Sequence, residues 1–135
     1  MKVKLMDIID AMEDSNIDVS AFVDKKTGEI VYFDDNIMTQ EEMEELDETL
    51  EEHGCARIPD KFEINDYNIM ASFVQSRSDT EYKRLSRAII GKGAFRRFKD
   101  GVYRLGIEKE WYKWRDNTYK RRAIEWCEEN GLEYE

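Results

Sequence analysis

The fold class is decided by residues 18–34, which read DVSAFVDKKTGEIVYFD. Between Asp18 and Asp24, apolar residues recur at every second position, which predicts a strand with one buried face. The return stretch Glu29–Asp34 is dense in residues that favour strands. Between the two stretches, Gly28 can adopt the positive φ that closes a short turn. We therefore predict a β-hairpin.

Two strands alone are marginally stable, so other elements must extend or cover the hairpin. We expect a weak third strand near Ala56–Ile58. Apolar residues at helical spacing predict helices over most of the remaining chain. These helices cover Val3–Met12, Thr39–Glu52, three stretches between Asn65 and Val102 with stops at Gly91 and Gly93 and an interruption near Gly101, and Ile107–Asn130, which Gly131 closes.

Each predicted helix has an apolar stripe that we expect to be buried. In the helix 39–52, Thr39 is the expected cap and Gly54 the expected end. The expected stripes are Met43/Leu46/Leu50, Tyr67/Met70/Ala71/Val74, Tyr82/Leu85/Ile89/Ile90, Phe95/Phe98/Val102 and Trp111/Tyr112/Tyr119/Ala123/Trp126. The fold class is thus α+β: a small antiparallel β-hairpin-based sheet with a predominantly helical C-terminal half.

Composition predicts one domain without an export signal. The chain has 135 residues, 41% of them hydrophobic, and a single proline, Pro59. No apolar run approaches the ~18 residues that a membrane helix needs, and the acidic N-terminal stretch is unlike a signal peptide. We expect a cytoplasmic protein that does not bind membranes. Its two cysteines, Cys55 and Cys127, should then be reduced thiols.

Charge is distributed unevenly along the chain. The formal net charge is -10. An acidic N-terminal part, 1–78, has 20 Asp/Glu and 7 Lys/Arg, whereas a basic helical part, 79–135, has 11 Asp/Glu and 14 Lys/Arg. All 14 of those basic residues lie within 83–122, beside only four acidic ones, so that segment carries +10. A basic segment in an acidic protein can bind an anionic partner or be neutralised by the protein's own acidic half.

Three successive helices present basic side chains away from their apolar stripes. The outward groups are Lys83/Arg84/Arg87, Arg96/Arg97/Arg104 and Lys113/Lys120/Arg121. From this part of the chain we predict a polyanion-binding face made of Lys92, Arg96, Arg97, Lys99, Lys113, Trp114 and Arg121. Single-stranded nucleic acid is bound by such mixtures of aromatic and basic residues. Packing in or near the core is the favoured alternative for Trp114, because tryptophan is usually largely buried.

The stretch Gly91-Lys92-Gly93 joins two of these helices. Backbone N–H groups at the start of the second helix could hold a phosphate, as in a helix-hairpin-helix. That motif usually has an apolar residue between the glycines, and Lys92 departs from it. A tight turn without a ligand is therefore the favoured interpretation.

Catalytic and metal-binding patterns do not assemble in the sequence. The only histidine, His53, has no closely spaced ligands beyond Cys55, so we expect no metal site and assign His53 to the C-terminal end of its helix. The glycines form neither a dinucleotide fingerprint nor a P-loop. We expect no cofactor and no catalytic residue, and a binding protein is favoured over an enzyme.

Several stretches resemble a known family. They are Leu5–Met12, Thr27–Tyr32, Ile64–Tyr67, Gly91–Asp100, Trp111-Tyr112, Arg115-Asp116 and Ile124–Gly131. Together the stretches are similar to a bacterial set, uncharacterised protein family 0158. The resemblance covers most of the chain and is most specific in Gly91–Asp100. It implies a bacterial cytoplasmic protein of unknown function and transfers no catalytic residue.

Two binding functions follow from the charges, with an enzyme as a third possibility. The first is binding of nucleic acid or another polyanion to the basic helical face. The alternative is a protein-interaction or regulatory module in which the acidic helix 39–52 binds a basic partner or a second copy. The third is an enzyme with an unfamiliar carboxylate site. The acidic half could also cover and neutralise the basic faces, and the sequence predicts no oligomeric state.

Overall fold

The computed structural model describes residues 2–135 and has the predicted α+β fold. The described residues form two compact units. Unit 1 comprises the residues up to Ile64 together with Tyr119–Glu135, and unit 2 comprises Asn65–Thr118. Unit 1 contains the sheet, whereas unit 2 is helical. Among residues 2–135, no helix is long and apolar enough to cross a membrane.

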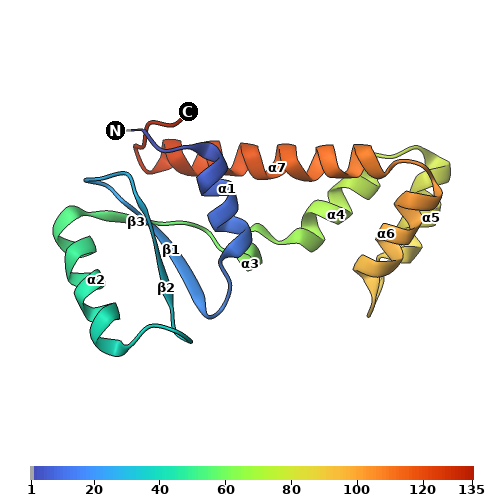
Figure 1. Ribbon diagram of the computed structural model, residues 1–135. Coiled ribbons are helices and arrows are strands. Elements are labelled where there is room, and N and C mark those ends of the chain that lie inside the picture. The colour runs from blue at the N-terminus through green and yellow to red at the C-terminus, as the bar shows by residue number, and fades with distance from the viewer. Residues whose placement is uncertain (1) are drawn as a thin grey trace. The chain divides into compact units, whose positions relative to one another are not determined.

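The sheet of unit 1 has three antiparallel strands in the order β2-β1-β3 (Figure 1). They are β1 (Val19–Asp24), β2 (Ile30–Asp34) and β3 (Cys55–Arg57). The predicted hairpin is confirmed: Ala21 pairs with Tyr32, and Gly28 has a φ of 80°. The weak third strand is also confirmed, since Val23 pairs with Ala56. Ala21 and Val23 are fully buried, as the alternation of the sequence predicts.

The described part of unit 1 contains three complete helices; the first two match helices that the sequence predicts, and the third lies in a stretch where it predicts none. They are α1 (Leu5–Asp14), α2 (Gln40–His53) and α3 (Lys61–Ile64). Helix α1 contacts β1 and β2 and buries Ile8 and Met12. Helix α2 begins at its predicted cap, where the backbone N–H of Glu42 donates to Oγ1 of Thr39 at 3.1 Å. Of the stripe predicted for α2, Leu50 is buried, and the other two residues are half-buried.

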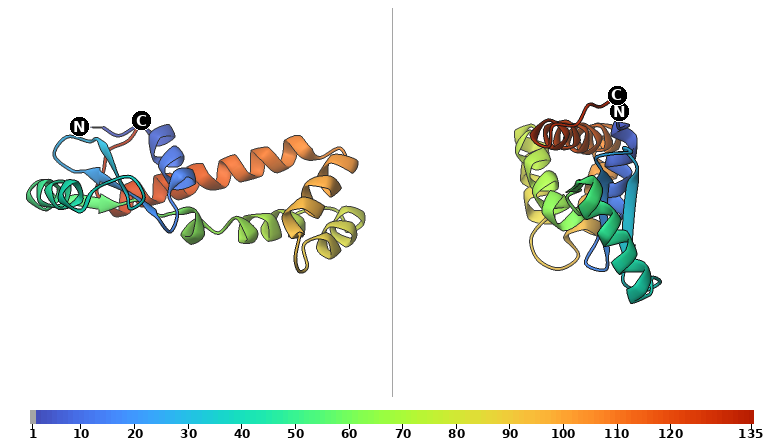
Figure 2. Two further views of the ribbon diagram at one scale, coloured as in Figure 1. Left: turned by 60° about the horizontal axis from the view of Figure 1, so that its bottom comes forward. Right: turned by 90° about the vertical axis from the view of Figure 1, so that its left-hand side faces the viewer.

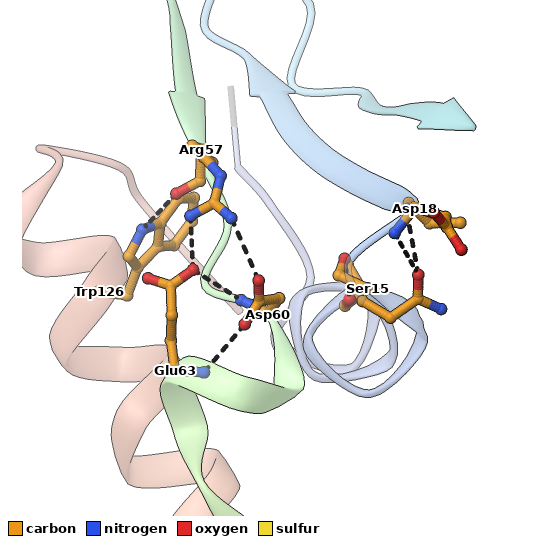
Figure 3. Close-up of polar contacts among 9 residues, drawn as sticks. Ser15, Asp18, Arg57, Asp60, Glu63 and Trp126 are labelled. Atoms are coloured by element: carbon orange, nitrogen blue, oxygen red, sulfur yellow. Dashed lines mark hydrogen bonds and ion pairs between the residues drawn. The ribbon is translucent and has the colours of Figure 1, made fainter. Parts of the chain in front are cut away.

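Polar contacts tie the end of β3 to α3 and to helix α7 (Glu108–Glu129), whose C-terminal half belongs to unit 1. The indole Nε1–H of Trp126 donates to the carbonyl oxygen of Arg57 at 3.0 Å. The Arg57 guanidinium pairs with Glu63 and lies 3.3 Å from Oδ2 of Asp60 (Figure 3). Beyond α7, Tyr134 forms a parallel β-bridge with Val3, in which the N–H of Glu135 donates to the carbonyl of Val3.

Unit 2 packs four helical segments around aromatic rings. They are α4 (Asp66–Gln75), α5 (Asp79–Ala88), α6 (Ala94–Arg104) and residues 108–118 of α7. Phe73, Phe98 and Trp111 meet edge to face, with ring centroids 4.7–6.0 Å apart. Such pairs contribute about 0.5–1.5 kcal/mol each beyond the area they bury. This cluster fixes α4, α6 and the start of α7 against one another.

Some of the predicted stripes of unit 2 are wrong by one residue. The buried line of α6 is Ala94, Phe98 and Val102, so Phe95 falls at its edge and is 43% exposed. Four other residues predicted to be buried are also exposed, by 42–71%; these are Tyr67, Tyr82, Ile90 and Tyr112. The predicted interruption near Gly101 is also wrong, because α6 continues to Arg104. Gly101 instead permits close packing, since a Cβ there would lie 2.9 Å from Cδ2 of Leu85.

Candidate functional site

The positive charge of the protein is concentrated in unit 2. Unit 2 contains 12 Lys/Arg and 7 Asp/Glu, a net charge of +5, whereas unit 1 contains 9 and 24, a net charge of -15. Two hollows on unit 2 bring cationic side chains together. Unit 2 is therefore the part of the protein that attracts an anion most strongly.

The first hollow lies between α5 and α6, which run side by side (Figure 2). Its volume is about 420 Å³. We call it the arginine groove; it is lined by Arg84, Arg87, Arg97 and Arg104, by Asp100, and by Leu85, Ala88, Gly101 and Leu105. Apolar side chains thus form part of its surface, beside four guanidinium groups. Arginine is well suited to bind phosphate, because its planar fork offers two parallel N–H donors.

The turn between α5 and α6 sets the two walls of the arginine groove. Gly91 and Gly93 have φ values of 78° and 76°, a region that favours glycine. The side chain of Arg97 folds back on this turn. Its Nε donates to the carbonyl of Ala88 at 2.9 Å, and its two terminal nitrogens donate to those of Ile90 and Lys92. The geometry agrees with the favoured interpretation of a tight turn, and Arg97 is one of its structural ties.

The other three arginines of the groove have no such partner among the residues that the structure describes. Arg84, Arg87 and Arg104 are exposed. Among the described residues 2–135, no carboxylate lies within 4.0 Å of their nitrogens, although Asp100 lines the same groove. Their positive charges are therefore available to an external anion.

The remaining residues of the predicted site are distributed over both units. Lys92 lies in the turn, Arg96 and Lys99 on α6, and Lys113 on α7, all exposed and in unit 2. Arg121 belongs to unit 1, where its Nε is 3.9 Å from Oε1 of Glu125. Within unit 2 the structure therefore brings together the basic residues of α5, α6 and their turn.

Trp114 is in a packed position. Its ring meets Phe73 edge to face at 5.8 Å, and its Nε1–H donates to Oγ of Ser72 at 3.2 Å. The indole is half-buried and is held by both contacts. This is the geometry that the packing alternative predicts for Trp114.

The second hollow of unit 2, of about 250 Å³, contains aromatic residues that were not predicted as site residues. We call it the aromatic pocket; it is lined by Asp66, Phe95, Lys99, Trp111, Tyr112 and Arg115. Phe95 and Tyr112 are 43% and 49% exposed, whereas the apolar stripes of the sequence predict that both are buried. A signal was present in the basic residues beside them, Arg96 and Lys113, but the sequence pattern alone does not separate a core edge from a binding surface.

A histidine–carboxylate pair lies in unit 1. Nδ1 of His53 is 2.7 Å from Oδ2 of the buried Asp24, whose Oδ1 accepts the N–H of Lys26. Burial raises the pKa of Asp24, but the hydrogen bond to His53 and those from Lys26 and Thr27 outweigh it, so that this pKa lies below its usual value. The pair joins the end of α2 to the end of β1, a structural role.

Other reactive side chains of the described residues do not form a site. No three potential metal ligands come together within residues 2–135. Both cysteines are free thiols: Cys55 is exposed, and burial raises the pKa of Cys127.

The comparisons with known proteins provide a family. Residues 1–135, the whole chain, match the model described as Uncharacterised protein family (UPF0158). Neither the comparison with curated proteins nor that with solved structures finds a match.

Proposed function

Because the chain belongs to uncharacterised protein family UPF0158, whose description assigns no activity, we propose a function from the charges of unit 2: it binds a polyanion, such as nucleic acid, in the arginine groove. One observation carries the proposal. Arg84, Arg87 and Arg104 line a single hollow, and no carboxylate within the described chain neutralises them. The bacterial cytoplasm, which the family resemblance implies, contains nucleic acids and other polyanions.

The arrangement favours a chain of phosphates over one small anion. The groove is open along two helices, and its arginines come from both of them. Further exposed cations, Lys92 and Arg96, lie on the turn and on α6. Each phosphate that such groups neutralise releases counterions, which makes binding strongly dependent on salt.

The test measures binding as a function of salt concentration. Fluorescence anisotropy with a labelled mixed-sequence 20-nucleotide RNA, a 20-base-pair DNA duplex or long-chain polyphosphate gives the affinity between 50 and 200 mM NaCl. The triple variant Arg84→Gln/Arg87→Gln/Arg104→Gln should lower the slope of log K against log salt by about 2, because roughly 0.7 is lost per contact with a single strand.

A matched control removes the same amount of charge elsewhere. Lys2→Gln/Lys25→Gln/Lys26→Gln changes three exposed lysines of unit 1 and the net charge by the same three units. The control should keep the slope of the unmodified protein. Equal slopes for both triple variants, or no binding at 50 mM salt and micromolar protein, would contradict the proposal.

Binding of a basic protein partner to α2 is the second candidate. A hollow of about 330 Å³ on this helix is lined by Met38 and Leu46, with Glu42, Glu45 and Thr49 around them. Apolar groups beside carboxylates complement a basic amphipathic helix. Glu42→Gln/Glu45→Gln should weaken binding of a lysine-rich amphipathic peptide measured by calorimetry. This role would be excluded if the variant binds the peptide as tightly as the unmodified protein does and if light scattering gives both proteins the same mass.

A further inference from the structure

The aromatic pocket of unit 2 adds a second kind of chemistry to the same helix α6. On one side α6 lines the arginine groove through Arg97 and Arg104, and on another it lines the aromatic pocket through Phe95 and Lys99. We propose that the aromatic pocket receives an unpaired base of a single-stranded nucleic acid whose phosphates lie in the arginine groove. This inference rests on the proposed function and specifies its ligand.

The lining of the aromatic pocket suits a flat ring. Phe95 and Tyr112 are each nearly half exposed, so their rings offer surface that a base can cover. Bases stack on such rings regardless of sequence, because every base has a π-face. The ring centroid of Trp111 lies 4.7 Å from that of Phe98, and the ring contributes to the rigid wall of the pocket. A pre-formed aromatic surface loses little conformational entropy when a base binds.

The charges of the aromatic pocket favour a base there and a phosphate at its rim. Asp66 lines the pocket and lies 3.9 Å from Arg115, so these two opposite charges largely compensate each other. With these two charges paired, the rings of Phe95 and Tyr112 remain as an uncharged surface on which a base can lie. Lys99 has no ion pair in the described chain and can neutralise the adjoining phosphate.

The size of the aromatic pocket also indicates part of a larger ligand. At about 250 Å³ it is smaller than the ~300–1,000 Å³ of typical small-molecule sites. A base that is anchored through its own strand needs no deeper cavity, because the rest of the strand is bound elsewhere.

The exposed ridge of α6 connects the two hollows. At 100° per residue, Arg96 and Tyr103 lie opposite the buried line Ala94–Phe98–Val102 and between the two hollows. Tyr103 is 73% exposed. A helix is about 10–12 Å across with its side chains, so a strand of a few nucleotides spans this ridge. A duplex cannot use the aromatic pocket, because its bases are paired and stacked inside.

The experiment compares ligands that differ in their bases but not in their phosphates. A 12-nucleotide single-stranded RNA and DNA, an abasic phosphodiester of the same length, a 12-base-pair duplex and polyphosphate are titrated at one salt concentration, and tryptophan fluorescence is recorded. The single strands should bind at least about tenfold more tightly than the abasic oligomer and quench the fluorescence of Trp111, which lines the pocket.

Variants then test whether the rings of Phe95 and Tyr112 cause the difference in affinity between the single strands and the abasic oligomer. Phe95→Ala/Tyr112→Ala should weaken single-strand binding roughly five- to hundredfold, the range for loss of base–aromatic stacking, and leave the abasic oligomer within about twofold. Phe95→Leu/Tyr112→Leu keeps apolar volume without rings and should lose the same preference, which guards against a folding defect. Tyr82→Ala is the control, an exposed tyrosine on α5 outside both hollows.

The outcomes separate this inference from the proposed function. If abasic oligomer, polyphosphate and single strands bind equally and the aromatic variants change nothing, the base pocket is refuted while polyanion binding stands. If none of the ligands binds at 50 mM salt, both are refuted. A preference for the duplex over the single strands would likewise overturn the base pocket.

Discussion

Replacing Arg97 tests whether this arginine is a structural tie rather than a ligand-binding group. Its guanidinium donates to the carbonyls of Ala88, Ile90 and Lys92. A net ~0.5–1 kcal/mol per hydrogen bond is appropriate, because the side chain is exposed and water can replace part of each bond. Arg97→Ala should therefore lower the free energy of unfolding by about 2 kcal/mol.

This loss corresponds to a measurable change in Tm. With ~2.1 cal/mol/K of unfolding entropy per residue, 135 residues give about 0.3 kcal/mol/K. Arg97→Ala should lower Tm by about 7 °C in thermal unfolding followed by circular dichroism. Arg97→Lys should recover only a minority of the loss, because an ammonium group keeps the charge but not the planar fork.

The neighbouring residue supplies the control. Arg96 is also exposed on α6 but has no ion pair in the described chain. Arg96→Ala should change the free energy of unfolding by less than ~0.5 kcal/mol, as surface substitutions usually do. If the two alanine variants melt at the same temperature, or if Arg97→Lys melts like the unmodified protein, the assignment of Arg97 to the turn is wrong.

Three further changes probe other contacts. Because the pKa of Asp24 is lowered in the folded protein, its contribution to stability is present above its ordinary pKa of 3.8 and is lost as pH falls below that value. In urea melts, the free energy of unfolding of His53→Gln should therefore fall less on acidification than that of the unmodified protein. An equal fall in both proteins would contradict the pairing. Gly101→Ala should cost about 1 kcal/mol, because overpacking against Leu85 exceeds the gain in helix propensity, and should become stabilising in Leu85→Ala; a cost unchanged in that background would refute the contact. Thr39→Ala should cost about 1 kcal/mol through loss of the α2 cap, and an unchanged urea midpoint would show that the cap contributes nothing.

Local patterns predicted much of the fold, because they depend on residues close together in the chain. The alternation in 18–24 and the turn at Gly28 gave the hairpin with its exposed and buried faces. The Thr39 cap and the glycine after α2 gave that helix nearly to the residue. The α+β fold class follows from these elements.

Long-range packing could not be predicted in the same way. The choice between Ala94 and Phe95 as the buried residue depends on which side of α6 meets Phe73 and Trp111, and apolar character favours the larger ring. Likewise, Arg97 and Arg96 are chemically identical neighbours, and only the backbone path of the Gly91–Gly93 turn separates a structural tie from an available charge. The pairing of His53 with Asp24 joins residues that are 29 positions apart.

The bridge between Val3 and Tyr134 bears on the order in which the protein folds during synthesis. Unit 1 includes Tyr119–Glu135, and within it the N–H of Val3 donates to the carbonyl of Glu133. All of unit 2 has been translated before those residues leave the ribosome. Unit 1 can therefore be completed only after its last segment has emerged, whereas the arginine-bearing helices of unit 2 can begin to assemble earlier.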